Sequence, residues 1–296
     1  MKRFLILGAN GQLGIELQRA FSGTGQVIAY GRAECDLSNA DNIRAAIRNT
    51  RPEVILNAAA YTAVDRAESE PDVAMRVNGE APGILAEEAK KHNAVLVHYS
   101  TDYVFDGTKA GPWVEDDPTH PVNVYGASKL AGERNIQQVG GAFLIFRTSW
   151  VFSPHGKNFL LTMLRLGQER QELRIVNEQH GAPTSALALA DATRRVLEKT
   201  AASQLEERAG LFHMSCAGEA TWYDFARAIF QKAQAEKPWP SVIGIPSSEY
   251  PTPAVRPANS ILSNKKLSKV FDVELPSWED ALEASLRSIR LGNRNA

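Results

Sequence analysis

The first twenty residues constrain the fold more than any other stretch of the sequence. Phe4 to Leu7 is a short apolar run, typical of a central parallel strand covered on both faces, and we predict a strand over residues 3–7. A glycine-rich stretch follows at once, after which Leu13, Leu17 and Phe21 recur at helical spacing. This order of strand, turn and helix predicts an α/β fold with a doubly wound parallel sheet of the Rossmann type.

The glycine-rich stretch is the first candidate for a ligand site. Its spacing is GxxGxxG, whereas the first and third glycines of the dinucleotide fingerprint GxGxxG lie one residue closer together. Glycines let the backbone approach a pyrophosphate, and the N-terminus of the next helix favours its charge. Plain turns also use glycine, but the position at the first strand-to-helix junction favours a cofactor. The predicted cofactor contacts here are Gly8, Asn10, Gly11, Gln12, Leu13 and Gly14.

Composition narrows the class of protein. The chain has 296 residues, enough for one large domain or two smaller ones, and 44% of them are apolar. A net charge of −1 provides no basic field for nucleic acid or for a membrane surface. The apolar run at the start is too short for a signal peptide or a membrane span. The two cysteines, Cys35 and Cys216, are typical of a reduced, cytoplasmic protein.

The end of the second predicted strand, residues 26–30, bears on the choice of cofactor. NAD sites usually place Asp or Glu there to hold the ribose 2′-hydroxyl, but this strand is followed by Gly31 and Arg32. A 2′-phosphate partner for Arg32 would favour NADPH over NADH, and a plain surface arginine is an equally good interpretation. Asp36 and Leu37 lie where an adenine contact is expected.

Two later strands are followed by small or hydroxyl side chains. Residues 58–60 are alanines that come after a strand predicted over residues 54–57. They leave room for a ligand, or equally for close helix packing. Thr101 stands at the end of a strand predicted over residues 95–100. A hydroxyl there also suits a simple strand-end cap, but ligands of doubly wound sheets bind beyond the carboxyl ends of the strands.

The stretch Tyr125-Gly126-Ala127-Ser128-Lys129 places a tyrosine and a lysine four residues apart. On a helix both side chains share a face, so an ammonium near the phenol lowers its pKa and allows proton transfer to a substrate oxygen. Alone, the pattern is weak. Thr101 stands at a strand end upstream, and the glycine-rich turn comes earlier still. Together these three motifs predict reduction of a carbonyl with a nicotinamide cofactor, with Thr101, Tyr125 and Lys129 as catalytic residues.

On these motifs the chain resembles an extended short-chain dehydrogenase/reductase, and most closely the dTDP-4-dehydrorhamnose reductase family. The resemblance covers essentially the whole chain. It lies in residues 8–14, 57–65, 100–105, 123–126, 147–152, 181–184, 250–253 and 256–257. It implies a cytoplasmic NAD(P)H-dependent oxidoreductase that reduces the C4 ketone of dTDP-4-dehydro-β-L-rhamnose, the last step of dTDP-L-rhamnose synthesis, within carbohydrate and lipopolysaccharide O-antigen biosynthesis.

The resemblance also implies roles for individual residues. Tyr125 would donate the proton to the ketone oxygen, Lys129 would lower the pKa of Tyr125 and bind the nicotinamide ribose, and Thr101 would orient the ketone. Ala58, Ala59 and Ala60 would line the cofactor, and Trp150 would offer the sugar an apolar face. Arg256, held between prolines, would clamp the diphosphate, although an exposed loop arginine is the alternative. The implied substrate contacts are Thr62, Val64, Thr101, Asp102, Tyr103, Trp150, Asn158 and Arg256.

Neighbouring functions differ at identifiable positions. A sugar-nucleotide 4,6-dehydratase needs Asp-Glu after the strand-end threonine, and here Asp102 is followed by Tyr103. Another sugar-nucleotide 4-ketoreductase, or an epimerase that keeps its cofactor bound, remains an alternative, as does a regulatory homologue that binds NADP without turnover. Some family members hold a divalent metal at a dimer contact through glutamates. Glu16 suits that role, but Leu187 cannot ligate, so we predict no metal.

Two domains are expected from the pattern. Residues 1–150 and 186–216 would form the dinucleotide-binding domain, and residues 151–185 and 217–296 a smaller domain for the sugar nucleotide. The predicted partner is a dTDP-sugar, with neither nucleic acid nor membrane, and the chain is expected to be a monomer or a homodimer. His180, a lone loop histidine, is expected to have no catalytic role.

Overall fold

The computed structural model describes residues 2–200, 202–233 and 238–294, and it is built around one parallel sheet. The strand order is β10-β5-β4-β3-β1-β2, and all five neighbouring pairs run parallel. The predicted doubly wound sheet is therefore confirmed. The bounds of these strands are β1 (Arg3–Leu7), β2 (Gln26–Tyr30), β3 (Val54–Asn57), β4 (Val95–Thr101), β5 (Phe143–Thr148) and β10 (Gly210–His213).

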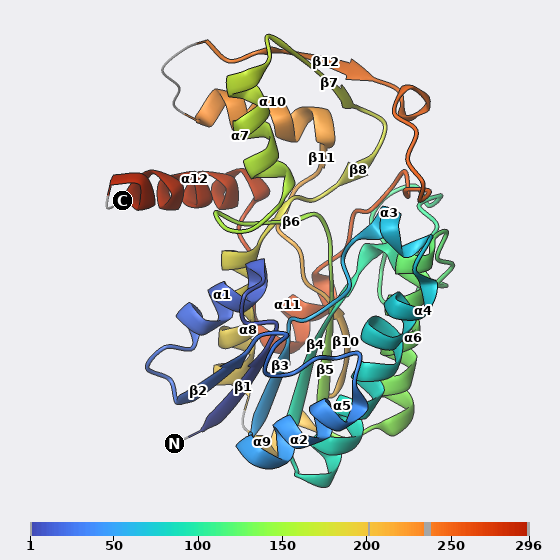
Figure 1. Ribbon diagram of the computed structural model, residues 1–296, viewed down its shortest axis with the longest axis vertical. Coiled ribbons are helices and arrows are strands. Elements are labelled where there is room, and N and C mark those ends of the chain that lie inside the picture. Colours follow the sequence, from blue (N-terminus) through green and yellow to red (C-terminus); the bar gives the residue numbers. More distant parts are fainter. Residues whose placement is uncertain (1, 201, 234–237, 295–296) are drawn as a thin grey trace.

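Helices cover both faces of the sheet, as Figure 1 shows. One face packs against α1 (Gln12–Ala20), α8 (Ala186–Lys199) and α11 (Lys265–Phe271). The other packs against α2 (Ala40–Thr50), α5 (Ala81–Lys91) and α6 (Val124–Val139). Alternate residues of a strand serve the two faces: Phe4 and Ile6 of β1 lie in the first core, and Leu5 and Leu7 in the second. This double burial explains the continuous apolar run at the start of the sequence.

A second group of elements forms the upper part of the molecule in Figure 1, with its own apolar core around Phe152, Phe225 and Trp278. It contains α7 (Phe159–Glu169), α10 (Trp222–Lys232) and α12 (Trp278–Arg294), with β7 (Glu172–Val176) parallel to β12 (Ser241–Ile245). Two short pairings lie in the same chain segments: β6 (Val151–Phe152) with β9 (Thr184–Ser185), and β8 (His180–Gly181) with β11 (Ala220–Thr221).

Short helical segments complete the chain. The stretch between β3 and β4 contains α3 (Val64–Ala67), α4 (Pro71–Ala74) and a π-helical turn, η1 (Met75–Glu80), before α5. Two 3₁₀ turns are η2 (Asp102–Val104), directly after β4, and η3 (Ser247–Glu249), and α9 spans Ala202–Leu205. Within the part of the chain that the structure describes, no helix has both the length and the apolar character needed to cross a membrane.

Candidate active site

The glycine-rich turn joins β1 to α1 at the carboxyl edge of the sheet. Gly8 has φ +80°, and a Cβ there would lie 2.7 Å from the backbone nitrogen of Ala59. A Cβ on Gly14 would lie 2.0 Å from the carbonyl oxygen of Gly8. Both positions therefore require glycine, because backbone atoms cannot yield as a flexible side chain can. The turn and the alanine segment after β3 form one backbone cradle, which is the shape a dinucleotide pyrophosphate needs.

The residues after β2 lie at the rim of this cradle. Arg32 is 82% exposed, and its Nε lies 3.4 Å from a carboxylate oxygen of Asp36. Hydrogen bonds from Ser38 are the main cause that lowers the pKa of Asp36. Leu37 is buried. An acid that we did not single out, Glu34, accepts a hydrogen bond from the backbone N–H of Gly31 at 2.9 Å, so a carboxylate does stand at the end of β2.

Thr101 and Tyr125 meet at the carboxyl end of β4. Thr101 is buried, accepts the backbone N–H of Tyr103 at 3.2 Å and donates to Asp102 at 2.9 Å. Tyr125 lies in the first turn of α6, whose start is fixed because the Asn123 side chain accepts the N–H of Gly126. Burial and then the charge of Asp102 raise the pKa of the Tyr125 phenol, and a hydrogen bond with Thr101 opposes them.

Lys129 lies one turn further along α6 and is also buried. Its Nζ donates to the carbonyl oxygen of Tyr99 at 2.6 Å and lies 3.3 Å from Nε2 of His98. Burial lowers the pKa of Lys129 to about 8, and the negative charge of Glu133 opposes this shift. We expected Lys129 to lower the pKa of Tyr125. In this arrangement that expectation is wrong, because β4 holds the amine and burial dominates at the phenol.

Asp102 and Tyr103 form the wall next to these hydroxyls. Burial raises the pKa of the Asp102 carboxyl to about 6. Tyr103 packs edge-on against Tyr125 with ring centroids 5.6 Å apart, and its hydroxyl accepts from Arg256 at 3.2 Å. Several predicted substrate residues thus share one wall, and Arg256 reaches it from a position 153 residues after Tyr103 in the sequence.

Arg256 is not an exposed loop arginine. Its Nη2 donates to both carboxylate oxygens of Asp65, at 2.9 and 3.0 Å. It also lines a cavity of about 330 Å³ together with Tyr250, Thr252 and Glu178. The guanidinium is therefore held at a cavity and already has a carboxylate partner, which sequence reasoning did not predict.

Trp150 and Asn158 connect the sheet region to the upper elements. The Trp150 indole stacks on Trp222 with centroids 3.7 Å apart and 9° between the planes, so one face of the indole is covered there. The Trp150 backbone has φ +48°, an uncommon conformation for a bulky residue. Asn158 caps α7 and donates to the Gln12 side chain at 2.9 Å, linking α7 to the glycine turn.

The remaining predicted residues lie in looser surroundings. Thr62 is exposed and Val64 half-buried, at the start of α3. Glu16 is buried, with one carboxylate oxygen 3.3 Å from Arg19 and 3.2 Å from His155, and Leu187 is exposed. Among residues 2–200, 202–233 and 238–294, no group of three or more His, Cys, Asp or Glu side chains is placed to hold a metal ion. His180 pairs with Glu219 at 2.8 Å on the surface.

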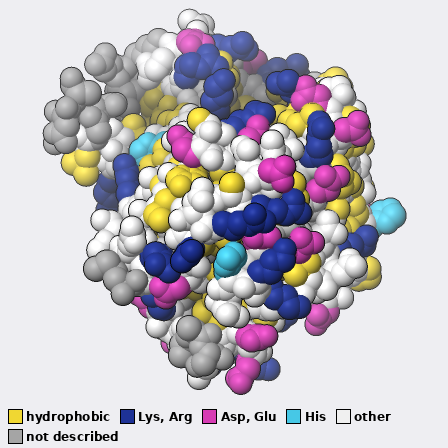
Figure 2. All heavy atoms as spheres, turned by 60° about the horizontal axis from the view of Figure 1, so that its bottom comes forward, with side chains coloured by type: hydrophobic (Ala, Val, Ile, Leu, Met, Phe, Trp, Pro, Cys, Tyr) yellow, Lys and Arg dark blue, Asp and Glu magenta, His cyan; other side chains and the backbone are white. Residues whose placement is uncertain are grey.

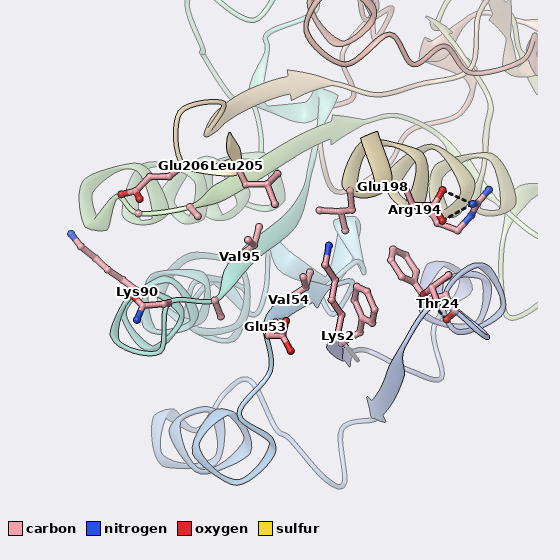
Figure 3. Close-up of a pocket in the computed structure, with 17 residues that line it drawn as sticks. Lys2, Thr24, Glu53, Val54, Lys90, Val95, Arg194, Glu198, Leu205 and Glu206 are labelled. Atoms are coloured by element: carbon pink, nitrogen blue, oxygen red, sulfur yellow. Dashed lines mark hydrogen bonds and ion pairs between the residues drawn. The ribbon is translucent and has the colours of Figure 1, made fainter. Parts of the chain in front are cut away.

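The opposite edge of the sheet contains a larger cavity, of about 820 Å³. Lys2, Glu53 and Val95 line it where strands begin, and Arg194 pairs with Glu198 beside it (Figure 3). None of the predicted catalytic or ligand residues lines this cavity. Figure 2, which brings the lower end of the molecule forward, shows basic and acidic side chains interspersed on that face. Of the two cavities, only the smaller one at the carboxyl edge is lined by a predicted site residue, Arg256.

The chain is similar to known proteins over almost its full length. The family model described as the RmlD substrate binding domain matches residues 1–291. A dTDP-4-dehydrorhamnose reductase from Burkholderia thailandensis is 48% identical, covering 97% of this chain and 99% of that protein. One from Salmonella typhimurium is 46% identical, covering 93% and 94%. A crystal structure of dTDP-4-dehydrorhamnose reductase from Bacillus anthracis in complex with NADP matches with a TM-score of 0.90 at 34% identity, covering 97% and 100%.

Proposed function

The chain belongs to the family of the RmlD substrate binding domain, and we propose that it is the reductase that converts dTDP-4-dehydro-β-L-rhamnose to dTDP-β-L-rhamnose with NADPH. One observation carries the proposal: Thr101 and Tyr125 meet at the carboxyl end of β4, with Lys129 one turn further along α6, at the same sheet edge as the glycine cradle. That convergence supplies a proton donor beside the place where a nicotinamide is expected.

The cofactor fits this chain because the absence of side chains at Gly8 and Gly14 lets the turn pack directly on neighbouring backbone, and glycine turns at this junction let a pyrophosphate approach the start of the helix. Gly8, Asn10, Gly11, Gln12, Leu13 and Gly14 would hold the pyrophosphate, with Ala58, Ala59 and Ala60 beside it. Gly31, Arg32, Asp36 and Leu37 would hold the adenosine end, and Tyr125 and Lys129 the nicotinamide ribose. When bound, the dinucleotide supplies the hydride. Everything else in the reaction is the work of the protein's own side chains.

Those side chains would orient the ketone and provide its proton. The Thr101 hydroxyl would bind the ketone oxygen, and the Tyr125 phenol would donate its proton to that oxygen as it becomes an alcohol. A buried, water-poor wall strengthens both hydrogen bonds. Asp102, Tyr103 and Trp150 would contact the sugar, Thr62, Val64 and Asn158 would lie around it, and Arg256 would bind the diphosphate after exchanging Asp65 for it.

We assign the rest of the architecture on the same basis. Residues 1–150 and 186–216 would form the cofactor domain and residues 151–185 and 217–296 the sugar-nucleotide domain, which agrees with the separate apolar core around Phe225. A cytoplasmic location agrees with Cys35 and Cys216, both buried and free. We propose a monomer or homodimer without a resident metal, because Leu187 offers no ligand near Glu16.

The direct test is absorbance at the reduced-nicotinamide band. Purified protein would be mixed with NADPH and with dTDP-4-dehydro-L-rhamnose generated in situ, and the sugar product identified. We expect loss of absorbance matched by formation of dTDP-rhamnose. An unchanged absorbance with a rearranged sugar would instead show an epimerase, and bound NADPH with neither change would show a regulatory binder.

A further inference from the structure

A buried histidine behind the active site has no place in the reaction described so far. His98 is 1% exposed, on β4, three residues before Thr101. Its Nδ1 lies 3.0 Å from Nδ2 of Asn57 at the end of β3, and its Nε2 lies 3.3 Å from Nζ of Lys129. A polar ring in the middle of a fully buried strand is costly unless both nitrogens have partners. Here both partners belong to residues at the candidate site.

The direction of these hydrogen bonds follows from Asn57. Its Oδ1 accepts the backbone N–H of Ala59 at 3.3 Å, so its Nδ2 faces the histidine and must donate. Nδ1 of His98 is then the acceptor. Burial is the main cause that holds the pKa of His98 well below its usual value, and Lys129 lowers it further when protonated. The ring is therefore neutral in either state of the lysine, and its one proton lies on Nε2. That proton points at Nζ of Lys129.

This direction has a consequence for the lysine. A neutral amine accepts a hydrogen bond from the Nε2–H of His98 and can still donate to the Tyr99 carbonyl, whereas an ammonium would face Nε2–H donor to donor. A further charged group that acts on the amine is Glu133 on α6. Arg147 of β5 donates to both oxygens of Glu133, at 2.9 and 2.6 Å. Because Arg147 satisfies Glu133, the contacts on β4 decide where the amine rests.

We propose that His98 is a positioning residue for Lys129, holding its amine in a retracted place on β4 through a line of hydrogen bonds that begins at the backbone of Ala59. The inference rests on the proposed function. The line of hydrogen bonds begins at the cofactor cradle, because the backbone of Ala59 packs against Gly8 there. The line of hydrogen bonds therefore connects the backbone of the cofactor cradle, through Asn57 and the His98 ring, to the lysine.

The proposal is tested with two replacements of His98 that remove different contacts. His98→Asn keeps an amide near the position of Nδ1 for Asn57 but does not reach Lys129. His98→Gln is longer and reaches Lys129 with its amide. Thr193→Val is the matched control, because it removes a buried 2.8 Å hydrogen bond to the Tyr99 hydroxyl on the opposite face of the same strand.

Two readouts separate a positioning role from a merely structural one. In the cofactor-free protein, the pH titration of the Lys129 side chain is followed by NMR, with the signal assigned from its loss in Lys129→Met. We expect a midpoint near 8 in the wild type and about one pH unit higher in His98→Asn, since the opposing N–H is gone. During turnover, His98→Asn should lower kcat about tenfold with KM values within about twofold, and His98→Gln should recover kcat to within about threefold.

The outcomes are distinct from those that test the reductase itself. Thr193→Val should lower the melting temperature while leaving the Lys129 midpoint and kcat unchanged. The proposal is overturned if His98→Asn behaves like Thr193→Val, with reduced stability but an unmoved midpoint and kcat. If His98→Asn does not fold, His98→Leu takes its place, because leucine suits a buried strand and offers no N–H to Lys129. An unmoved Lys129 midpoint in His98→Leu overturns the proposal equally. The NMR titration needs no turnover, so a wild type without NADPH oxidation would refute the proposed function and leave this measurement valid.

Discussion

The cofactor side and the substrate side of this site are built differently. On the cofactor side, the space for a ligand is defined by backbone: the Gly8 turn, the Ala59 segment and the start of α1 approach so closely that no side chain fits between them. On the substrate side, the groups that would bind the sugar nucleotide are side chains already engaged with one another, Arg256 with Asp65 and Trp150 with Trp222. The cofactor cradle is therefore preformed, whereas substrate binding must exchange existing partners.

The largest effect is expected where the backbone cradle is filled. Gly8→Ala and Gly23→Ala introduce the same methyl at nearly the same backbone angle, φ +80° and +82°. At Gly23 the methyl meets nothing within 4 Å, while at Gly8 it would lie 2.7 Å from the Ala59 backbone. We expect Gly23→Ala to cost about 1 kcal/mol of stability. Gly8→Ala should cost about 3 kcal/mol more and abolish NADPH binding.

Urea unfolding and titration of NADPH fluorescence would measure both quantities. Equal stability and equal NADPH binding in the two variants would mean that the cradle can open to admit a methyl group. That result would contradict the claim that the cofactor cradle is preformed.

The next effect concerns a charge buried on the substrate side. Burial raises the pKa of Asp102 from 3.8 to about 6, so the folded state holds this proton more tightly than the unfolded chain does. The resulting stabilisation is complete below about pH 4 and is lost as pH rises through 6, a change of about 3 kcal/mol. Asp102→Asn keeps an acceptor for the Thr101 hydroxyl and removes the charge.

We therefore expect Asp102→Asn to match the wild type in urea unfolding near pH 4 and to be more stable by up to about 3 kcal/mol at pH 8. A constant difference across that pH range would show that Asp102 does not titrate as the structure implies.

A smaller effect is expected at the diphosphate end. Arg256→Met should raise KM for the sugar nucleotide about 10- to 100-fold, because the variant loses the guanidinium that would bind the diphosphate with two hydrogen bonds. The Kd for NADPH should stay unchanged, because Arg256 lies on the substrate side of the site. Asp65→Asn is its companion: freeing the guanidinium from a charged competitor should lower that KM. Steady-state kinetics at saturating NADPH measures both, and a higher KM in Asp65→Asn would show that Asp65 positions Arg256 and does not compete with the substrate.

The smallest effect tests specificity at the cofactor rim. Arg32 is exposed and only loosely paired, so its contact with a 2′-phosphate would be screened by solvent. Arg32→Ala should lower kcat/KM with NADPH about 10-fold and leave the value with NADH unchanged. If kcat/KM falls equally with both cofactors, or falls with neither, Arg32 has no role in specificity. Glu34 would then be the residue at this position that hydrogen-bonds the ribose.

The contrast between the two sides also explains what the sequence could predict. The cofactor side could be predicted because each of its signals is a short local pattern. The glycine spacing follows directly on one apolar strand, and the three alanines follow directly on another. The substrate side depends on contacts between distant segments, such as Asp65 with Arg256 and Trp150 with Trp222, and no local pattern encodes those pairs. His98 is visible in the sequence as a polar residue directly after the apolar start of β4, but its partner Asn57 lies 41 residues away.

The most direct test of the account is the replacement Tyr125→Phe, which removes only the phenolic oxygen of the proposed proton donor. We predict that kcat for NADPH oxidation with the dTDP-4-keto sugar falls by about 10²- to 10⁴-fold. The Kd for NADPH should stay within about twofold of the wild type, because the cradle is untouched. Wild-type turnover in Tyr125→Phe would contradict the assignment of the proton donor and, with it, the proposed mechanism.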